Sequence, residues 1–172
     1  LAHYRNDTRV MHISGNNSLT DLDGLENIDS IGHTLQISSN RGLRNIEALS
    51  RITLIGDELN VSTNRWLGSL RGLHNITAVG GDLTLWSNDS LTNLDSLGSL
   101  TSIGGDLNIR GNDELTDITG LNSVTTVTGD LEITDNTNLA TCSAEEFGNH
   151  LTRHGWAGVA TIRDNDDTGT CE

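Results

Sequence analysis

The sequence predicts an all-β parallel solenoid of about five coils, and two repeated features support this prediction. A fixed period of ~20–30 residues is typical of solenoids, in which one coil buries its apolar side only against its neighbours. Each coil contains seven aliphatic positions, and all 35 of them hold Leu, Ile or Val. The coils are separated by an asparagine that recurs every 24 residues without insertion or deletion: Asn16, Asn40, Asn64, Asn88, Asn112 and Asn136.

The spacing inside each coil indicates short strands joined by tight bends. Segments such as 107–109 alternate inward and outward side chains, which is the pattern of a strand. The other aliphatic positions step by three residues, which suits extended chain interrupted by bends. A Gly pair precedes two of the strands, at 80–81 and 104–105, and is expected to supply the bend, a positive φ being one way to do so. Successive strands must then pair in parallel, about 4.8 Å apart.

The asparagine column is predicted to be structural. An Asn side chain at a solenoid corner satisfies backbone groups that the turn leaves unpaired, and each coil repeats the same bonds. A buried polar group without a partner would cost about 1–3 kcal/mol, so such a column has a clear physical reason. Contact with a ligand is the alternative interpretation of these asparagines.

The chain is interpreted as one domain, residues 1–172, with a cap at each end of the repeats. Open ends of a solenoid would expose sheet edges, which other chains could pair with. Residues 1–15 are predicted to form a half-coil cap, residues 16–139 the repeats, and residues 140–172 a C-terminal cap.

The C-terminal cap is predicted to contain one short helix and a final strand. Ser143 and Glu146 have the spacing of a capping box, which predicts the start of the helix. Gly155 predicts its end, and residues 155–162 have the composition of a strand.

The two cysteines, Cys142 and Cys171, enclose about 30 residues at this end of the chain. We expect a disulfide, which would stabilise the protein by roughly 3 kcal/mol over a loop of this size. Two free thiols are the alternative. A disulfide would place the protein in an oxidising compartment: the periplasm, the cell surface or the medium.

The charge of the chain excludes two classes of partner. The formal net charge is -14, and all ten basic residues are arginines. Nucleic acid and anionic lipid both require a basic surface, so neither is expected to bind. No apolar run approaches the ~20 residues that cross a bilayer, so membrane insertion is not expected either.

The run NDSLTNLDSLGSLTSIGGDLNIRGNDELTDITGLNSVTTVTGDLEITDN resembles the receptor L-domain family, which includes the ligand-binding lobes of the insulin and epidermal growth factor receptors. The resemblance covers about residues 10–140, and the ending NLATC…GWAGVATIRDNDDTGTC is similar to that of bacterial secreted members. It implies a right-handed β-helix with leucine-rich-repeat-like coils in a secreted or cell-surface protein. It implies no ligand, because the receptors' binding residues have no counterpart here.

The outward face of the strands is the first candidate binding surface. Trp86 is predicted to point outward, with Arg110 one coil above it and Trp66 just past the same corner. Thr84 and Asn108 lie on the same face. An exposed Trp beside Arg and amide groups is what a sugar or protein surface would use. The alternative is that Trp86 is a surface residue without a binding role, partly covered by Arg110.

Three weaker candidates each have a structural alternative. An acidic column could bind Ca²⁺ or perform acid–base chemistry, or could be a solvated edge: Glu58, Asp82, Asp106 and Asp130. A column of threonines could organise water as ice-binding proteins do, or could simply suit strands: Thr53, Thr77, Thr101 and Thr125. The His150–His154 pair has metal-binding spacing but no evident third ligand.

The tail resembles the first half of a calcium loop at Asp164, Asp166 and Thr168, and an acidic disulfide-tied tail is the alternative. No cofactor other than Ca²⁺ is indicated by the sequence.

The sequence therefore favours non-catalytic extracellular recognition of a glycan or a protein. No Ser-His-Asp motif, phosphate loop or Cys/His metal cluster is evident in the sequence. The main alternative is a structural spacer or adhesin segment of a surface protein. A polysaccharide-acting enzyme and an ice-binding protein are less favoured.

Overall fold

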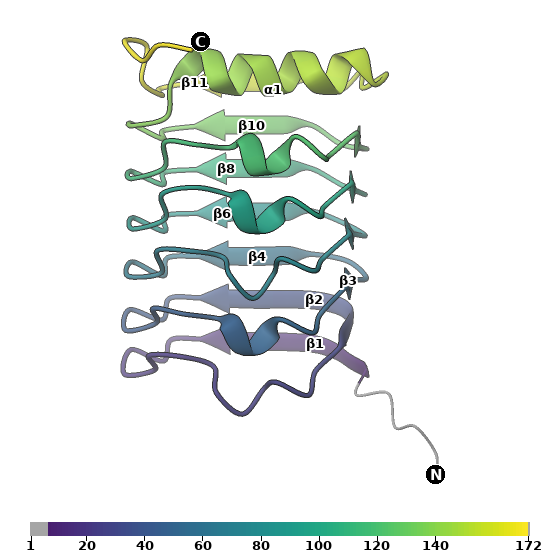
Figure 1. Cartoon of the computed structure of the whole chain (residues 1–172), viewed down its shortest axis with the longest axis vertical. Helices are drawn as coiled ribbons and strands as arrows, with labels where there is room; N and C mark the ends of the chain where they lie inside the picture. Colours follow the sequence, from purple (N-terminus) through teal and green to yellow (C-terminus); the bar gives the residue numbers. More distant parts are fainter. Residues whose placement is uncertain (1–6, 172) are drawn as a thin grey trace.

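The computed structural model describes residues 7–171 and confirms the parallel β-solenoid (Figure 1). One side of the stack is a row of strands in which each pairs in parallel with the next one in the row. This row comprises β1 (Asp7–Ser14), β2 (Ser30–Ser38), β4 (Leu59–Ser62), β6 (Leu83–Trp86), β8 (Leu107–Arg110), β10 (Leu131–Thr134) and β11 (Ala160–Arg163). The paired residues lie 24 apart from β2 to β10, so each inward column stacks on itself.

The other two sides of each coil carry shorter elements. Two-residue strands form a second parallel row that joins β2 at Ile31: β3 (Leu54–Ile55), β5 (Ala78–Val79), β7 (Ser102–Ile103) and β9 (Thr126–Val127). The remaining side contains single 3₁₀ turns: η1 (Glu47–Leu49), η2 (Asp95–Leu97) and η3 (Thr119–Leu121). These turns lie in front of the long strands in Figure 1.

The core is the column of aliphatic side chains that runs along the inside of the stack. Every one of the predicted inward positions is buried except Leu19, Leu25 and Ile28, which are half-buried. All three belong to the first coil. In the described chain, only β1 precedes this coil, so its strand side is covered by a neighbour and its other sides are not. The burial of these columns against one another is the main stabilising term of a solenoid.

The glycine pairs lie in bends before the strands, as expected, but the bends do not use a positive φ. None of Gly80, Gly81, Gly104 and Gly105 has a positive φ. A Cβ added at Gly80 would instead lie 2.1 Å from the Gly56 carbonyl oxygen, and one at Gly104 the same distance from that of Gly80. Glycine is therefore required because stacked backbones approach closely.

A positive φ recurs one residue before each asparagine of the 24-residue column. That position turns the chain at the corner with φ between 52° and 72° at Gly15, Ser39, Thr63, Ser87, Gly111 and Asp135. Non-glycine residues rarely adopt this conformation, so the repeated corner holds them there.

The C-terminal end is closed by α1 (Thr141–Arg153), which lies across the stack in Figure 1. The predicted helix start is wrong: the helix begins two residues before Ser143, and its N-cap residue, Ala140, makes no side-chain capping bond. The predicted end is confirmed, since Gly155 follows the helix with φ 90°. Phe147 and Leu151 face the last coil and are buried. Within the described residues, no helix is long and apolar enough to cross a membrane.

Candidate functional site

The asparagine column forms a continuous hydrogen-bonded ladder. Asn112 is typical: its Nδ2 donates to the Leu85 carbonyl oxygen at 3.0 Å, and its Oδ1 accepts the Asn88 backbone N–H at 3.0 Å. The same bonds recur at Asn40, Asn64, Asn88 and Asn136, all fully buried, and Asn16 begins the ladder on the surface. The predicted structural role of these residues is confirmed.

The ladder has a seventh member that the sequence analysis missed. The Oδ1 of Asn165 accepts the Asn136 backbone N–H at 3.1 Å, and its Nδ2 donates to the Ile133 carbonyl oxygen at 2.8 Å. The signal was present, because Asp164–Asn165 follows β11 as Asp135–Asn136 follows β10. Asn165 follows Asn136 by 29 residues, because α1 occupies part of this last turn. A search at a fixed spacing of 24 residues therefore misses it.

The three aspartates of the acidic column form a second ladder along the opposite end of the strands, whereas Glu58 accepts a hydrogen bond from Asn60 Nδ2 at 3.1 Å. The Oδ1 atoms of Asp82, Asp106 and Asp130 accept the backbone N–H groups one coil further on, each at 2.8 Å. Gly105 and Gly129 leave room for two of these carboxylates, since an added Cβ would lie 2.0 Å from the oxygen. These carboxylates are engaged in backbone bonds that join the coils.

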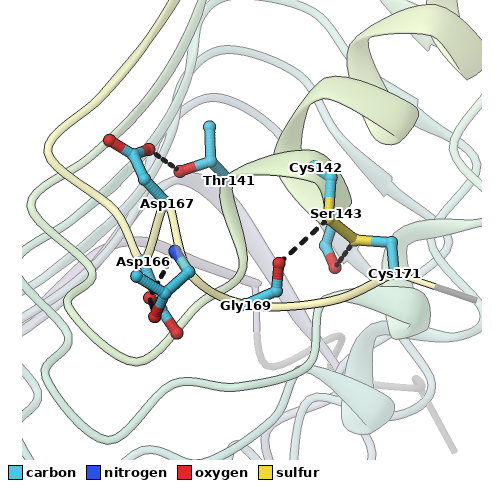
Figure 2. Close-up of a disulfide and its surroundings, with 8 residues drawn as sticks. Thr141, Cys142, Ser143, Asp166, Asp167, Gly169 and Cys171 are labelled. Atoms are coloured by element: carbon cyan, nitrogen blue, oxygen red, sulfur yellow. Dashed lines mark hydrogen bonds between the residues drawn. A yellow bond between two sulfur atoms is a disulfide. The ribbon is translucent and has the colours of Figure 1, made fainter.

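The predicted disulfide is confirmed and joins α1 to the tail (Figure 2). The sulfur atoms of Cys142 and Cys171 are bonded, with 6.1 Å between the two Cα atoms. Cys142 lies in the first turn of the helix, and Ser143 Oγ lies 3.2 Å from the Cys171 sulfur. The bond fixes the last residues of the tail against the cap.

The residues of the suggested calcium loop have protein partners. Asp164 pairs with Arg163, whereas Asp166 accepts hydrogen bonds from the hydroxyl and the backbone N–H of Thr168. These bonds, that of the Thr168 hydroxyl first, lower the pKa of the Asp166 carboxyl below its ordinary value. Asp167 accepts from the Thr141 hydroxyl at 2.6 Å. Across residues 7–171, no three His, Cys, Asp or Glu side chains converge on a common metal position.

The threonine column and the histidine pair also bond to the backbone. The Thr77 and Thr101 hydroxyls donate to the carbonyl oxygens of the threonines one coil before them, at 3.3 Å and 3.0 Å. His150 Nε2 donates to the Val124 carbonyl oxygen at 2.9 Å, and His154 Nδ1 to that of His150 at the same distance.

On the outward strand face, Trp86 is half exposed, with 50% of its surface open to solvent. It pairs in register with Ser62 on β4 and Arg110 on β8, as the repeat predicts. Arg110 is directed to carboxylates, with its guanidinium 3.3 Å from Asp135 and 4.0 Å from Glu132. Trp86 thus keeps an open indole surface beside the half-buried polar row that contains Thr84 and Asn108.

Trp66 lies past the Asn64 corner and is 52% exposed. Its ring has two guanidinium groups over it: that of Arg44 at 5.5 Å and that of Arg65 at 5.8 Å from the ring centroid. Trp66 is predicted from the sequence as part of the candidate surface, whereas these arginines are not. The signal was again the repeat, which brings Arg44 within one coil of Trp66.

The comparisons with known proteins identify no relative. A scan against protein-family models, a search of curated proteins and a search of solved structures each found no match to this chain. The resemblance to the receptor L-domain family therefore stays a prediction.

Proposed function

We propose that this protein is a non-catalytic recognition module that binds a glycan or an extracellular protein. The observation that supports this most directly is the pair of half-exposed indoles, Trp66 and Trp86, on either side of one corner of the solenoid. Indole faces are costly to leave in water and are a common means of stacking on sugar rings or packing against a partner.

The scaffold beneath these side chains favours binding. Trp86 lies on β6, which is hydrogen-bonded to strands on both sides, and Trp66 follows the buried ladder residue Asn64 by two positions. A surface that is already ordered loses little conformational entropy when a ligand binds, so modest contacts suffice. Thr84 and Asn108, which neighbour one another on the same sheet, offer hydroxyl and amide groups to a polar ligand.

We also propose that the protein works outside the cell or on its surface. The disulfide between Cys142 and Cys171 supports this, because such bonds persist in oxidising compartments. A bacterial secreted member of the receptor L-domain family would fit this location. A structural spacer remains the competing function, and it requires no ligand.

A glycan-array screen of the purified domain tests the proposal. The wild type is compared with Trp86→Ala and Trp66→Ala, in calcium and in chelator. Val159→Ala is the matched control, because Val159 is also exposed, at 65%, but lies beside β11 at the far end of the stack. Thermal melting of each variant checks that the fold is intact.

The expected result is a glycan signal that the Trp86 variant loses and the Val159 variant retains. A blank array would be followed by a screen against extracellular proteins with the same variants. If neither screen finds a ligand for a folded protein, the spacer function replaces the proposal.

A further inference from the structure

The charges of this chain are distributed unevenly along the solenoid. Residues 1–86 contain seven arginines and nine acidic residues, whereas residues 87–172 contain three and fifteen. The excess negative charge is therefore concentrated in the C-terminal half. At physiological ionic strength charges are screened beyond about 8 Å, so a ligand at the surface responds to the local charges and not to the net charge.

Arginines gather locally around Trp66. Arg41 and Arg65 are one coil apart in the same column, so their backbones stack about 4.8 Å from one another. Arg65 is 3.6 Å from Asp89, an exposed pair that contributes little. Within residues 7–171, neither Arg41 nor Arg44 forms an ion pair. Among the described residues, these three arginines therefore have one carboxylate as an ion-pair partner, that of Asp89.

Arg44 and Trp66 come from neighbouring coils and have glycines at the register positions beside them. The 24-residue register places Gly42 one coil before Trp66 and Gly68 one coil after Arg44. An added Cβ at Gly42 would lie 2.7 Å from the Asn17 carbonyl oxygen, so this position excludes a side chain. The Arg44 guanidinium carbon lies over the Trp66 ring, 5.5 Å from the ring centroid, so the two side chains meet across neighbouring coils.

We infer that this Arg–Trp cluster, defined by Arg41, Arg44, Arg65 and Trp66, binds an anionic sugar, that is, a sugar ring carrying a carboxylate or a sulfate. The inference rests on the proposed function and names its ligand class. The guanidinium groups stacked beside the indole keep N–H donors free for an oxyanion, often in a bidentate arrangement. The exposed part of the indole offers an apolar surface to the sugar ring.

An anionic sugar fits this surface better than an acidic peptide does. The two recognition elements, a flat ring surface and adjacent guanidinium groups, match a ligand whose charge is attached to a small rigid ring. Main-chain recognition of a peptide uses an unpaired strand edge, and the strands nearest the cluster, β4 and β6, are paired on both sides. A peptide is therefore treated as an outcome of the test.

The test is a calorimetric titration of the folded domain with defined probes. The anionic probes are trimers of galacturonic acid and of sulfated galactose. The neutral probe is the methyl-esterified galacturonate trimer, and hexaglutamate is the acidic peptide. The test variant is Arg44→Gln with Arg65→Gln, and the matched control is Arg51→Gln with Arg71→Gln. Both variants remove two positive charges from the same half of the solenoid, and the control arginines lie outside the cluster.

The expected result is that an anionic trimer binds and the neutral trimer does not. The test variant should weaken binding by about tenfold or more, as expected when charged hydrogen bonds are lost, whereas the control should retain it. Comparing the affinities of the galacturonic acid trimer and the sulfated galactose trimer shows whether the site prefers a carboxylate or a sulfate.

Three results would overturn the inference. One is equal weakening by both double variants, which would indicate a diffuse charge effect. Another is that the neutral trimer or hexaglutamate binds as tightly as the anionic trimers or more tightly. The third is no binding of either anionic trimer, even if the array has found a neutral glycan that Trp86→Ala loses; the proposed function would then stand and only the ligand class would fail.

Discussion

The side chain of Asn112 donates to the carbonyl oxygen of Leu85, 27 residues earlier in the chain, at 3.0 Å. Its Oδ1 atom accepts the backbone N–H of Asn88 from the same preceding coil. One buried amide thus satisfies two main-chain groups that the corner leaves unpaired. Because each coil repeats the arrangement, the ladder ties each coil to the one before it.

Replacing Asn112 with Ala is expected to destabilise the protein strongly. Two buried backbone groups would lose their partners, at about 1–3 kcal/mol each in the free energy of unfolding. Urea denaturation measures the loss. Asn138→Ala is the control, because Asn138 is exposed and should change stability by no more than about 0.5 kcal/mol. Similar losses in the two variants would show that the ladder is not a main source of stability.

Replacing Gly80 with Ala should also be destabilising, since the new Cβ would lie 2.1 Å from the Gly56 carbonyl oxygen. The stacked backbones would have to separate, and overpacking of this kind costs about 1–3 kcal/mol or more. Gly68→Ala is the comparison: its nearest atom, the Ser90 carbonyl oxygen, is 3.6 Å away, an ordinary contact. Thermal melting distinguishes the two, and a melting temperature for Gly80→Ala no lower than that of Gly68→Ala would contradict the close-stacking explanation.

The repeat made most of this fold predictable from the sequence. The inward positions and the asparagine column are set by a period that needs no knowledge of backbone angles. The role of Gly80 could not be predicted in the same way, because a glycine required for close approach and one required for positive φ have the same sequence signature. The residue type at the positive-φ position differs between coils, for example Ser39 and Asp135, so it does not indicate the backbone conformation.

The candidate site was predicted less completely than the fold. Trp66 and Trp86 are exposed as the outward positions require. The partners of these rings depend on side-chain directions, which the period does not determine: Arg110 is directed to Asp135, and Arg44 lies over Trp66. Where the last coil lengthens to include α1, the fixed period fails, and Asn165 is missed for that reason.

Asp106→Ala should cost about 1 kcal/mol, because the Asp130 backbone N–H loses its acceptor. Asp106→Asn keeps an acceptor oxygen at the same place and should lower the free energy of unfolding by less than Asp106→Ala does. Calcium or chelator should leave the melting temperature of the wild type unchanged. If the Asn variant lost as much stability as the Ala variant, the negative charge itself would matter, and a bound cation would have to be reconsidered.

Removing the disulfide with Cys142→Ser and Cys171→Ser is expected to lower the free energy of unfolding by roughly 3 kcal/mol, as for a loop of about 30 residues. Hydrogen exchange should quicken most in the tail after β11, including Asn165, because the tail is no longer tied to α1. The backbone amides of β6, in the middle of the stack, serve as the reference. Equal acceleration in β6 and in the tail would mean that the bond stabilises the whole solenoid and not its cap.

The most direct test of the recognition surface is to follow the three indole N–H resonances by NMR while a ligand from the array is added. The chain has three tryptophans, so each resonance reports on one place. Trp156 is an internal control, since its Nε1 already donates to the Gly129 carbonyl oxygen at 2.9 Å. We predict that the Trp66 and Trp86 signals shift and that the Trp156 signal stays. A shift of Trp156 alone would place binding at the α1–β11 end of the molecule and contradict the proposed surface.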